Sequence, residues 1–176
     1  MNILIEKILR EAGVIEEITF SLEKNHGYDF IFCKYKKKKI GYVSSIILTP
    51  EEGYPDEENE DEDKQQHMLG TFTGHGFYEL EETMPRDKYL QLIDNTNFAL
   101  LETIKVDQKF QKMGIGEMLI KKLLSELKSK NVKTIFLHAE QIENKELDYL
   151  IGFYKKCGFS ELKNYDGESS LMYRKI

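Results

Sequence analysis

Length, composition and charge set the first limits on this chain. Its 176 residues suit one domain with a substantial core, and its two cysteines, Cys33 and Cys157, suggest neither a disulfide framework nor a metal-binding cluster. The net charge of −6 arises in residues 51–63, which hold nine acids and no base, so that without those nine charges the chain would carry +3. Such an acidic stretch repels phosphate groups, which argues against nucleic acid as a substrate.

The first residues resemble neither a secretion signal nor a membrane anchor. Glu6 and Glu11 interrupt the apolar residues there, whereas a signal peptide needs a continuous apolar core. No apolar run in the chain approaches the roughly 20 residues that span a bilayer. We therefore expect a cytoplasmic protein with reduced thiols and no membrane partner.

The first third of the chain is predicted to contain one helix and three strands. Apolar residues share one face of a helix over 2–12, with Gly13 as its C-cap. A turn at 25–27 and an exposed hairpin tip at 36–39 join the strands. The strands are expected over residues 14–23, 29–35 and 40–48. The residues expected to fill the core from the second and third strands are Phe30, Phe32, Ile46 and Ile47.

Residues 50–97 separate the third predicted strand from the next. Pro50 ends the strand, and an acid-rich insertion at about 51–66 has too few apolar residues to pack, so we expect it to be mobile. Recruitment of a cationic substrate is the functional alternative for this insertion. Residues 68–82 fit a bulged strand or a loop, and helical spacing predicts a helix over 85–93.

A β-α-β unit is predicted over residues 98–139. Phe98–Val106 forms the first strand, and its apolar residues 99–101 face both ways, which is typical of a strand covered on both sides. The next apolar residues recur every four positions with charged residues between them, which predicts an amphipathic helix. These residues are Ile115, Leu119, Leu123 and Leu127. Residues 134–139 then predict the second strand.

The start of that helix is rich in glycine. A helix N-terminus leaves unpaired N–H groups and a partial positive charge, which together bind anions. Gly114 and Gly116 lack Cβ atoms, so a phosphate could approach the backbone closely there. Close packing of a helix against a strand would select the same two glycines, and this alternative stays open.

Two stretches resemble the GNAT superfamily of N-acetyltransferases. Residues 106–120 are similar to its acetyl-coenzyme A motif, Gln/Arg-x-x-Gly-x-Gly/Ala, with Gln111, Gly114 and Gly116 at the defining positions. Residues 153–159 (FYKKCGF) are similar to a second family motif, and the closing residues resemble the family's last strand. The resemblance implies an α/β domain of the mixed α+β type, in which helices flank a central mixed, splayed sheet.

The resemblance also implies where acetyl-coenzyme A binds. In the family, backbone amides of the first motif hold the pyrophosphate, and amides of the preceding strand, here residues 103–106, polarise the thioester carbonyl. We expect the sheet to splay near Val106 and the cosubstrate to enter the gap, without a metal. The family commonly has an asparagine where Leu147 stands, and Asn144 is the nearest substitute. The expected contacts are Ile104, Lys105, Val106, Gln111, Lys112, Met113, Gly114, Ile115, Gly116 and Asn144.

Acetyl transfer to an amine needs a neutral nucleophile and a stabilised leaving thiolate. Tyr154 matches the family tyrosine that serves the thiolate, and its alternative is an aromatic residue packed beside the sheet. Glu102 and His138, on the two strands of the β-α-β unit, are the candidate bases, with Glu140 a third. A solvent-facing carboxylate and a hydrogen-bonded structural histidine are the alternatives for the first two.

We therefore expect a single domain over 1–176 that moves an acetyl group from acetyl-coenzyme A directly to a primary amine. The acceptor would be a small molecule or a peptide. Transfer through a cysteine is disfavoured because neither thiol belongs to a nucleophile-base pattern. A coenzyme A-binding regulatory or interaction module without catalysis is the rival function, and a homodimer is compatible with either.

Overall fold

The computed structural model describes residues 17–49, 90–94, 96–140, 147–165 and 169–176. Several sequence predictions fall outside these residues and keep that status. They concern the helix over 2–12, the acidic insertion at about 51–66, residues 68–82 and Asn144. Of the helix predicted over 85–93, residues 90–92 are described and are helical.

The chain starts as a meander of three antiparallel strands, as predicted. They are β1 (Ile18–Asn25), β2 (Tyr28–Tyr35) and β3 (Lys38–Leu48). His26 and Gly27, with φ of 47° and 82°, form the first two-residue turn, and Lys36 and Lys37, with φ of 48° and 67°, form the second. Positive φ at both turn residues matches the right-handed twist of the flanking strands. The lysine-rich stretch is an exposed hairpin tip, as expected.

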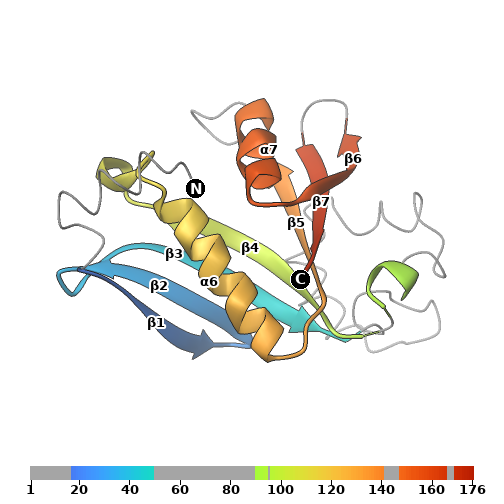
Figure 1. Cartoon of the computed structure of the whole chain (residues 1–176), viewed down its shortest axis with the longest axis horizontal. Coiled ribbons are helices and arrows are strands. Elements are labelled where there is room, and N and C mark those ends of the chain that lie inside the picture. Colours follow the sequence, from blue (N-terminus) through green and yellow to red (C-terminus); the bar gives the residue numbers. More distant parts are fainter. Residues whose placement is uncertain (1–16, 50–89, 95, 141–146, 166–168) are drawn as a thin grey trace.

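A parallel pair of strands joins two halves of one sheet (Figure 1). The described strands lie in the order β1-β2-β3-β4-β5-β7-β6, where only β4 (Phe98–Val106) and β5 (Thr134–Glu140) are parallel. The remaining strands are β6 (Ser160–Tyr165), which the sequence did not predict, and β7 (Ser169–Lys175). The mixed sheet with flanking helices is the expected fold class.

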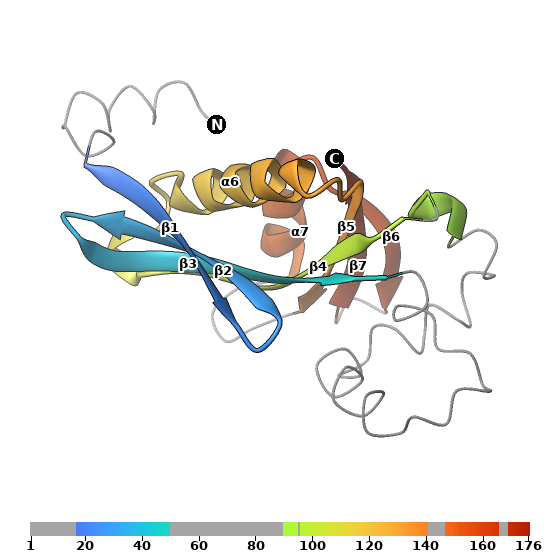
Figure 2. The ribbon, with the colours of Figure 1, turned by 90° about the horizontal axis from the view of Figure 1, so that it is seen from below.

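Two helices cover one face of the sheet (Figure 2). Helix α6 (Ile115–Ser129) packs on β2, β3 and β4, and α7 (Leu147–Lys156) packs on β5, β6 and β7. All four residues of the predicted four-residue repeat of α6 are buried. Gly158, at φ 83°, ends α7 while Phe159 N donates to the Tyr154 carbonyl at 3.1 Å. This glycine in the second motif therefore has a structural reason, because a helix C-terminus commonly ends in a left-handed residue.

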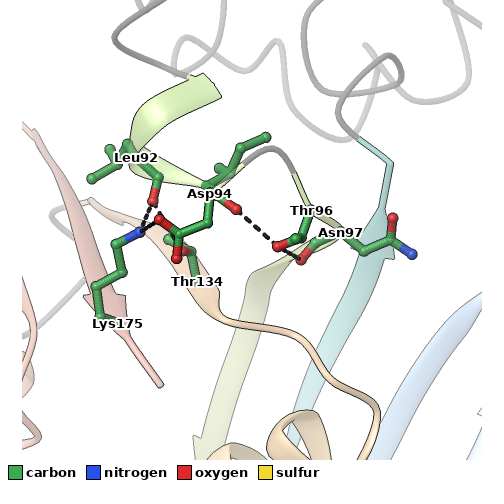
Figure 3. Close-up of polar contacts among 7 residues, drawn as sticks. Leu92, Asp94, Thr96, Asn97, Thr134 and Lys175 are labelled. Atoms are coloured by element: carbon green, nitrogen blue, oxygen red, sulfur yellow. Dashed lines mark hydrogen bonds and ion pairs between the residues drawn. The ribbon is translucent and has the colours of Figure 1, made fainter.

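The other face carries a smaller core at one end of the sheet. Ile93, Phe98 and Phe136 are fully buried there. Figure 3 shows how polar contacts fix the turn before β4 to the ends of β5 and β7. The carbonyl of Leu92 accepts a hydrogen bond from Thr134 Oγ1 at 3.1 Å and another from the Lys175 ammonium, which also pairs with Asp94 at 3.2 Å.

One part of the predicted core was wrong. In β2 the fully buried residues are Ile31 and Cys33, which face α6, whereas Phe30 and Phe32 lie on the opposite face. The two phenylalanine rings are half-buried and stack at a centroid distance of 6.0 Å. The strand alternates as predicted, but its smaller side chains fill the space under the helix. Ile46 and Ile47 are half-buried, and each packs against one of the two cores.

Candidate functional site

The two halves of the sheet separate beyond a short parallel seam. The seam between β4 and β5 consists of Ala99 opposite Ile135, Leu100 opposite Phe136 and Leu101 opposite Leu137. Past it, β4 pairs with β3 and β5 pairs with β7. A cleft of about 620 Å³ opens there, lined by both strands, the start of α6 and one face of α7. The splay was expected near Val106 and begins five residues earlier, at Leu101.

Glu102 is an extra residue in β4. Ser44 and Ser45 of β3 are consecutive, yet they pair with Thr103 and Leu101, so that Glu102 has no partner on β3 and forms a β-bulge. Bulges redirect side chains and are common beside active sites. The bulge places Ile104 and Val106 on the same face as Leu101, packed toward α6. A regular strand would have placed Thr103 and Lys105 there instead.

The two candidate bases stand on opposite walls at the narrow end of the cleft. Glu102 and His138 are the first residues beyond the last pair of the seam, and both line the cleft. Burial raises the pKa of the Glu102 carboxyl to about 7. His138 Nδ1 lies 3.0 Å from the Glu140 carboxylate, and Glu140 lines the cleft as well. A carboxyl with a pKa near neutrality is suited to accept a proton at physiological pH.

The loop from β4 to α6 forms a concave backbone at the opposite end of this wall. Lys112 and Gly114 adopt left-handed conformations with φ of 60° and 79°, and α6 begins immediately afterwards. Gln111 Nε2 donates to the Val106 carbonyl at 3.0 Å, which holds the loop against the strand it leaves. Left-handed residues that alternate with other conformations turn successive N–H groups toward one point, where an anion binds. The free N–H groups of the first helical turn add to this site.

Most of the predicted cosubstrate contacts line the cleft. Lys105 is exposed, and Met113 packs beside the larger core, so that neither side chain contributes to the lining. Asn144 lies outside the described residues. The predicted contacts that do line the cleft are Ile104, Val106, Gln111, Lys112, Gly114, Ile115 and Gly116.

Phe153 is a residue of the cleft that the site prediction missed. A Cβ atom added to Gly116 would lie 3.1 Å from Phe153 Cζ, which is closer than ordinary van der Waals contact. The ring therefore occupies the space that the missing side chain leaves, and it links α7 to the first turn of α6. Its position directly before Tyr154 in the second motif was the available signal. Gly116 thus serves helix packing and can serve a phosphate site as well.

Tyr154 is both a packed aromatic and a residue of the cleft. Its side chain is 7% exposed and makes edge contacts with Phe153 and Phe159 at centroid distances of 5.1 and 5.8 Å. Burial, followed by the influence of Cys157, raises the pKa of its phenol well above the usual range. The hydroxyl therefore keeps its proton at any physiological pH, as a hydrogen-bond donor must.

The comparison of the sequence with family patterns decides the class of this protein. The pattern of the Acetyltransferase (GNAT) family matches residues 5–159. The chain belongs to the GNAT family of acetyltransferases. The two motifs that suggested this family are thereby confirmed as signs of it. No curated protein matches the sequence.

Solved structures of GNAT proteins share the fold. An acetyltransferase from Bacillus subtilis in complex with coenzyme A aligns with a TM-score of 0.54 and 10% identity, over 91% of this chain and 99% of that one. The ribosomal-protein-S18-alanine N-acetyltransferase from Escherichia coli gives 0.51 and 15%, over 97% and 88%. PaiA N-acetyltransferase from Thermoplasma acidophilum, also with coenzyme A, gives 0.51 and 14%, over 98% and 69%.

The thiols of this GNAT chain are not activated. Cys33 and Cys157 are both buried, and burial raises the pKa of each thiol to about 11. A nucleophilic cysteine needs a lowered pKa, so neither is suited to carry an acetyl group. Within the described part of the chain, no group of three or more His, Cys, Asp or Glu side chains could hold a metal ion. None of its described helices combines the length and apolar character that crossing a membrane requires.

Proposed function

We propose that this GNAT acetyltransferase transfers an acetyl group directly from acetyl-coenzyme A to a primary amine of a small molecule or a peptide. The observation that carries the proposal is the convergence of three features on one cleft. These are the concave backbone before α6, the half-buried carboxyl of Glu102 and the hydroxyl-bearing Tyr154. The coenzyme A complexes among its structural neighbours add support for the cosubstrate.

Each feature has a place in the proposed reaction. Glu102, or alternatively His138, accepts a proton from the ammonium form of the acceptor, because only the neutral amine attacks. The nitrogen forms the new C–N bond as the C–S bond of the thioester breaks. Tyr154 donates a hydrogen bond or a proton to the leaving thiolate. Beyond Leu101 the backbone of β4 no longer pairs with β5, so its polar groups on that edge are free of sheet partners and can bind the thioester arm.

The test is an acceptor screen with acetyl-coenzyme A that detects released thiol. The panel should contain small amines, diamines and peptides with a free N-terminus or a lysine. We expect amine-dependent thiol release and a product heavier by one acetyl group in mass spectrometry. Calorimetry with coenzyme A should accompany the screen. Binding without turnover of any acceptor in a broad panel would favour the regulatory module, and absence of binding would contradict both functions.

A further inference from the structure

A second hollow lies beside the cleft, on the outer side of α6. It measures about 460 Å³ and is enclosed by α6, the end of α7 and β7. Glu117 and Lys156 line both the cleft and this hollow, so the two spaces adjoin. Its walls include apolar side chains of α6, among them Ile120 and Leu124. The hollow therefore begins at the helix end where the proposed function puts the pyrophosphate.

The charge of the hollow is mainly positive. Lys121 from α6, Lys156 from α7 and Arg174 from β7 line it, together with the single acid Glu117. The Arg174 guanidinium donates to the Cys157 carbonyl at the end of α7, which fixes its position. An anion with an attached planar, apolar group would meet cations and hydrophobic surface in the same space.

The lysines of the hollow differ from their neighbours in sequence. Lys122 pairs with Glu126 at 2.6 Å, and Lys155 lies 4.0 Å from Glu161. Among the described residues, no carboxylate lies within ion-pair distance of Lys121 or Lys156. The two lysines that face the hollow thus have their charge available, while the two beside them are neutralised by acids of the fold.

We infer that this hollow binds the 3′-phosphorylated adenosine end of coenzyme A, with Lys121 and Lys156 directed to the 3′-phosphate. The inference rests on the proposed use of coenzyme A. Lys121 lies five residues beyond Gly116, or about 7.5 Å along the helix axis. A single ribose separates the 3′-phosphate from the pyrophosphate, so a nucleotide held at the helix N-terminus reaches this far. The adenine would then contact the apolar wall of α6.

The experiment compares coenzyme A with 3′-dephospho-coenzyme A by calorimetry. We expect wild type to prefer coenzyme A by about tenfold, the effect of one well-placed charged contact. In Lys121→Gln/Lys156→Gln the preference should fall below about threefold, with affinity for the dephospho compound changed little. The matched control Lys122→Gln/Lys155→Gln removes the same charge and should keep the preference. The preference should also shrink at high salt.

The outcomes separate this inference from the function on which it rests. Equal affinity of wild type for the two compounds overturns the inference and leaves the acetyltransferase function standing. Equal losses of preference in the test and control variants also overturn it, because a general effect of net charge then explains the result. If wild type binds neither compound, the proposed function fails and the inference fails with it.

Discussion

At the scale of single residues, the position of Glu102 explains its chemistry. The bulge turns a charged residue into the narrow end of a cleft, where water is partly excluded, and burial raises the pKa of its carboxyl. The ordinary value near 4.5 rises to about 7. Below pH 7 the carboxyl holds its proton and cannot act as a base, whereas above pH 7 it can. His138 stands across the seam and competes for the same role.

Glu102→Gln is predicted to remove a base without unfolding the protein. Wild-type kcat/KM should rise with pH through about 7, and the variant should lose at least about tenfold in kcat/KM at pH 8 together with that rise. Its free energy of unfolding at pH 8 should not decrease, because a neutral amide avoids the burial of a charge. His138→Gln is the matched comparison: if it abolishes the rise while Glu102→Gln keeps it, the histidine is the base.

Tyr154→Phe is predicted to slow turnover while coenzyme A affinity stays within about twofold. The substitution keeps the ring contacts with Phe153 and Phe159 and removes only the hydroxyl. Turnover should fall at least about tenfold, equivalent to about 1.4 kcal/mol in the barrier. Released thiol and calorimetry measure the two quantities. Tyr149→Phe is the control, because this tyrosine also lines the cleft and is 55% exposed. Equal turnover in wild type and Tyr154→Phe would assign Tyr154 to the core alone.

At the scale of elements, two glycines of the cleft separate packing from helix propensity. An added Cβ at Gly116 would press on Phe153, whereas one at Gly152 of α7 meets no atom within 4 Å. Gly152→Ala should therefore raise the free energy of unfolding by about 0.5–1 kcal/mol. Gly116→Ala should be less stable than Gly152→Ala by about 1–3 kcal/mol, because the ring must move. Urea denaturation measures both, and equal effects would show that the Phe153 ring yields freely.

The sequence predicted elements more reliably than it predicted faces. The four-residue repeat of α6, the alternation of the first strands and the two motifs depend on local spacing, and these predictions are confirmed. The assignment of Phe30 to the core failed because alternation does not say which side a helix will cover. Strand β6 was missed because an edge strand needs little apolar character. The bulge at Glu102 and the start of the splay depend on pairing between strands distant in sequence, which spacing along one strand does not record.

At the scale of the whole molecule, the closed end of the sheet balances the open one. The seam between the two halves is short, and past its far end the contacts of Leu92, Thr134 and Lys175 join the turn before β4 to β5 and β7. These contacts hold the halves together at the end away from the cleft (Figure 3). The splay can therefore stay open for a ligand without separation of the halves.

Thr134→Val is predicted to weaken that closed end. Thr134 is fully buried, and valine has nearly the same shape, so the main loss is the hydrogen bond to the Leu92 carbonyl. The free energy of unfolding should fall by about 0.5–1.5 kcal/mol. Urea denaturation measures it, with Thr19→Val on the exposed side of β1 as control. A loss no larger than that of the control would mean that the Lys175 contact alone holds Leu92.

The extra residue in β4 makes chain length, and not only composition, part of this fold. Deletion of Glu102 would restore plain alternation, turn Ile104 and Val106 away from α6 and bring Thr103 and Lys105 under the helix. Every later residue would keep its identity and lose its place relative to the cleft. A substitution at this codon changes the chemistry of one side chain, whereas loss of the codon shifts the frame of the whole wall. The gene can therefore vary this residue far more easily than it can do without it.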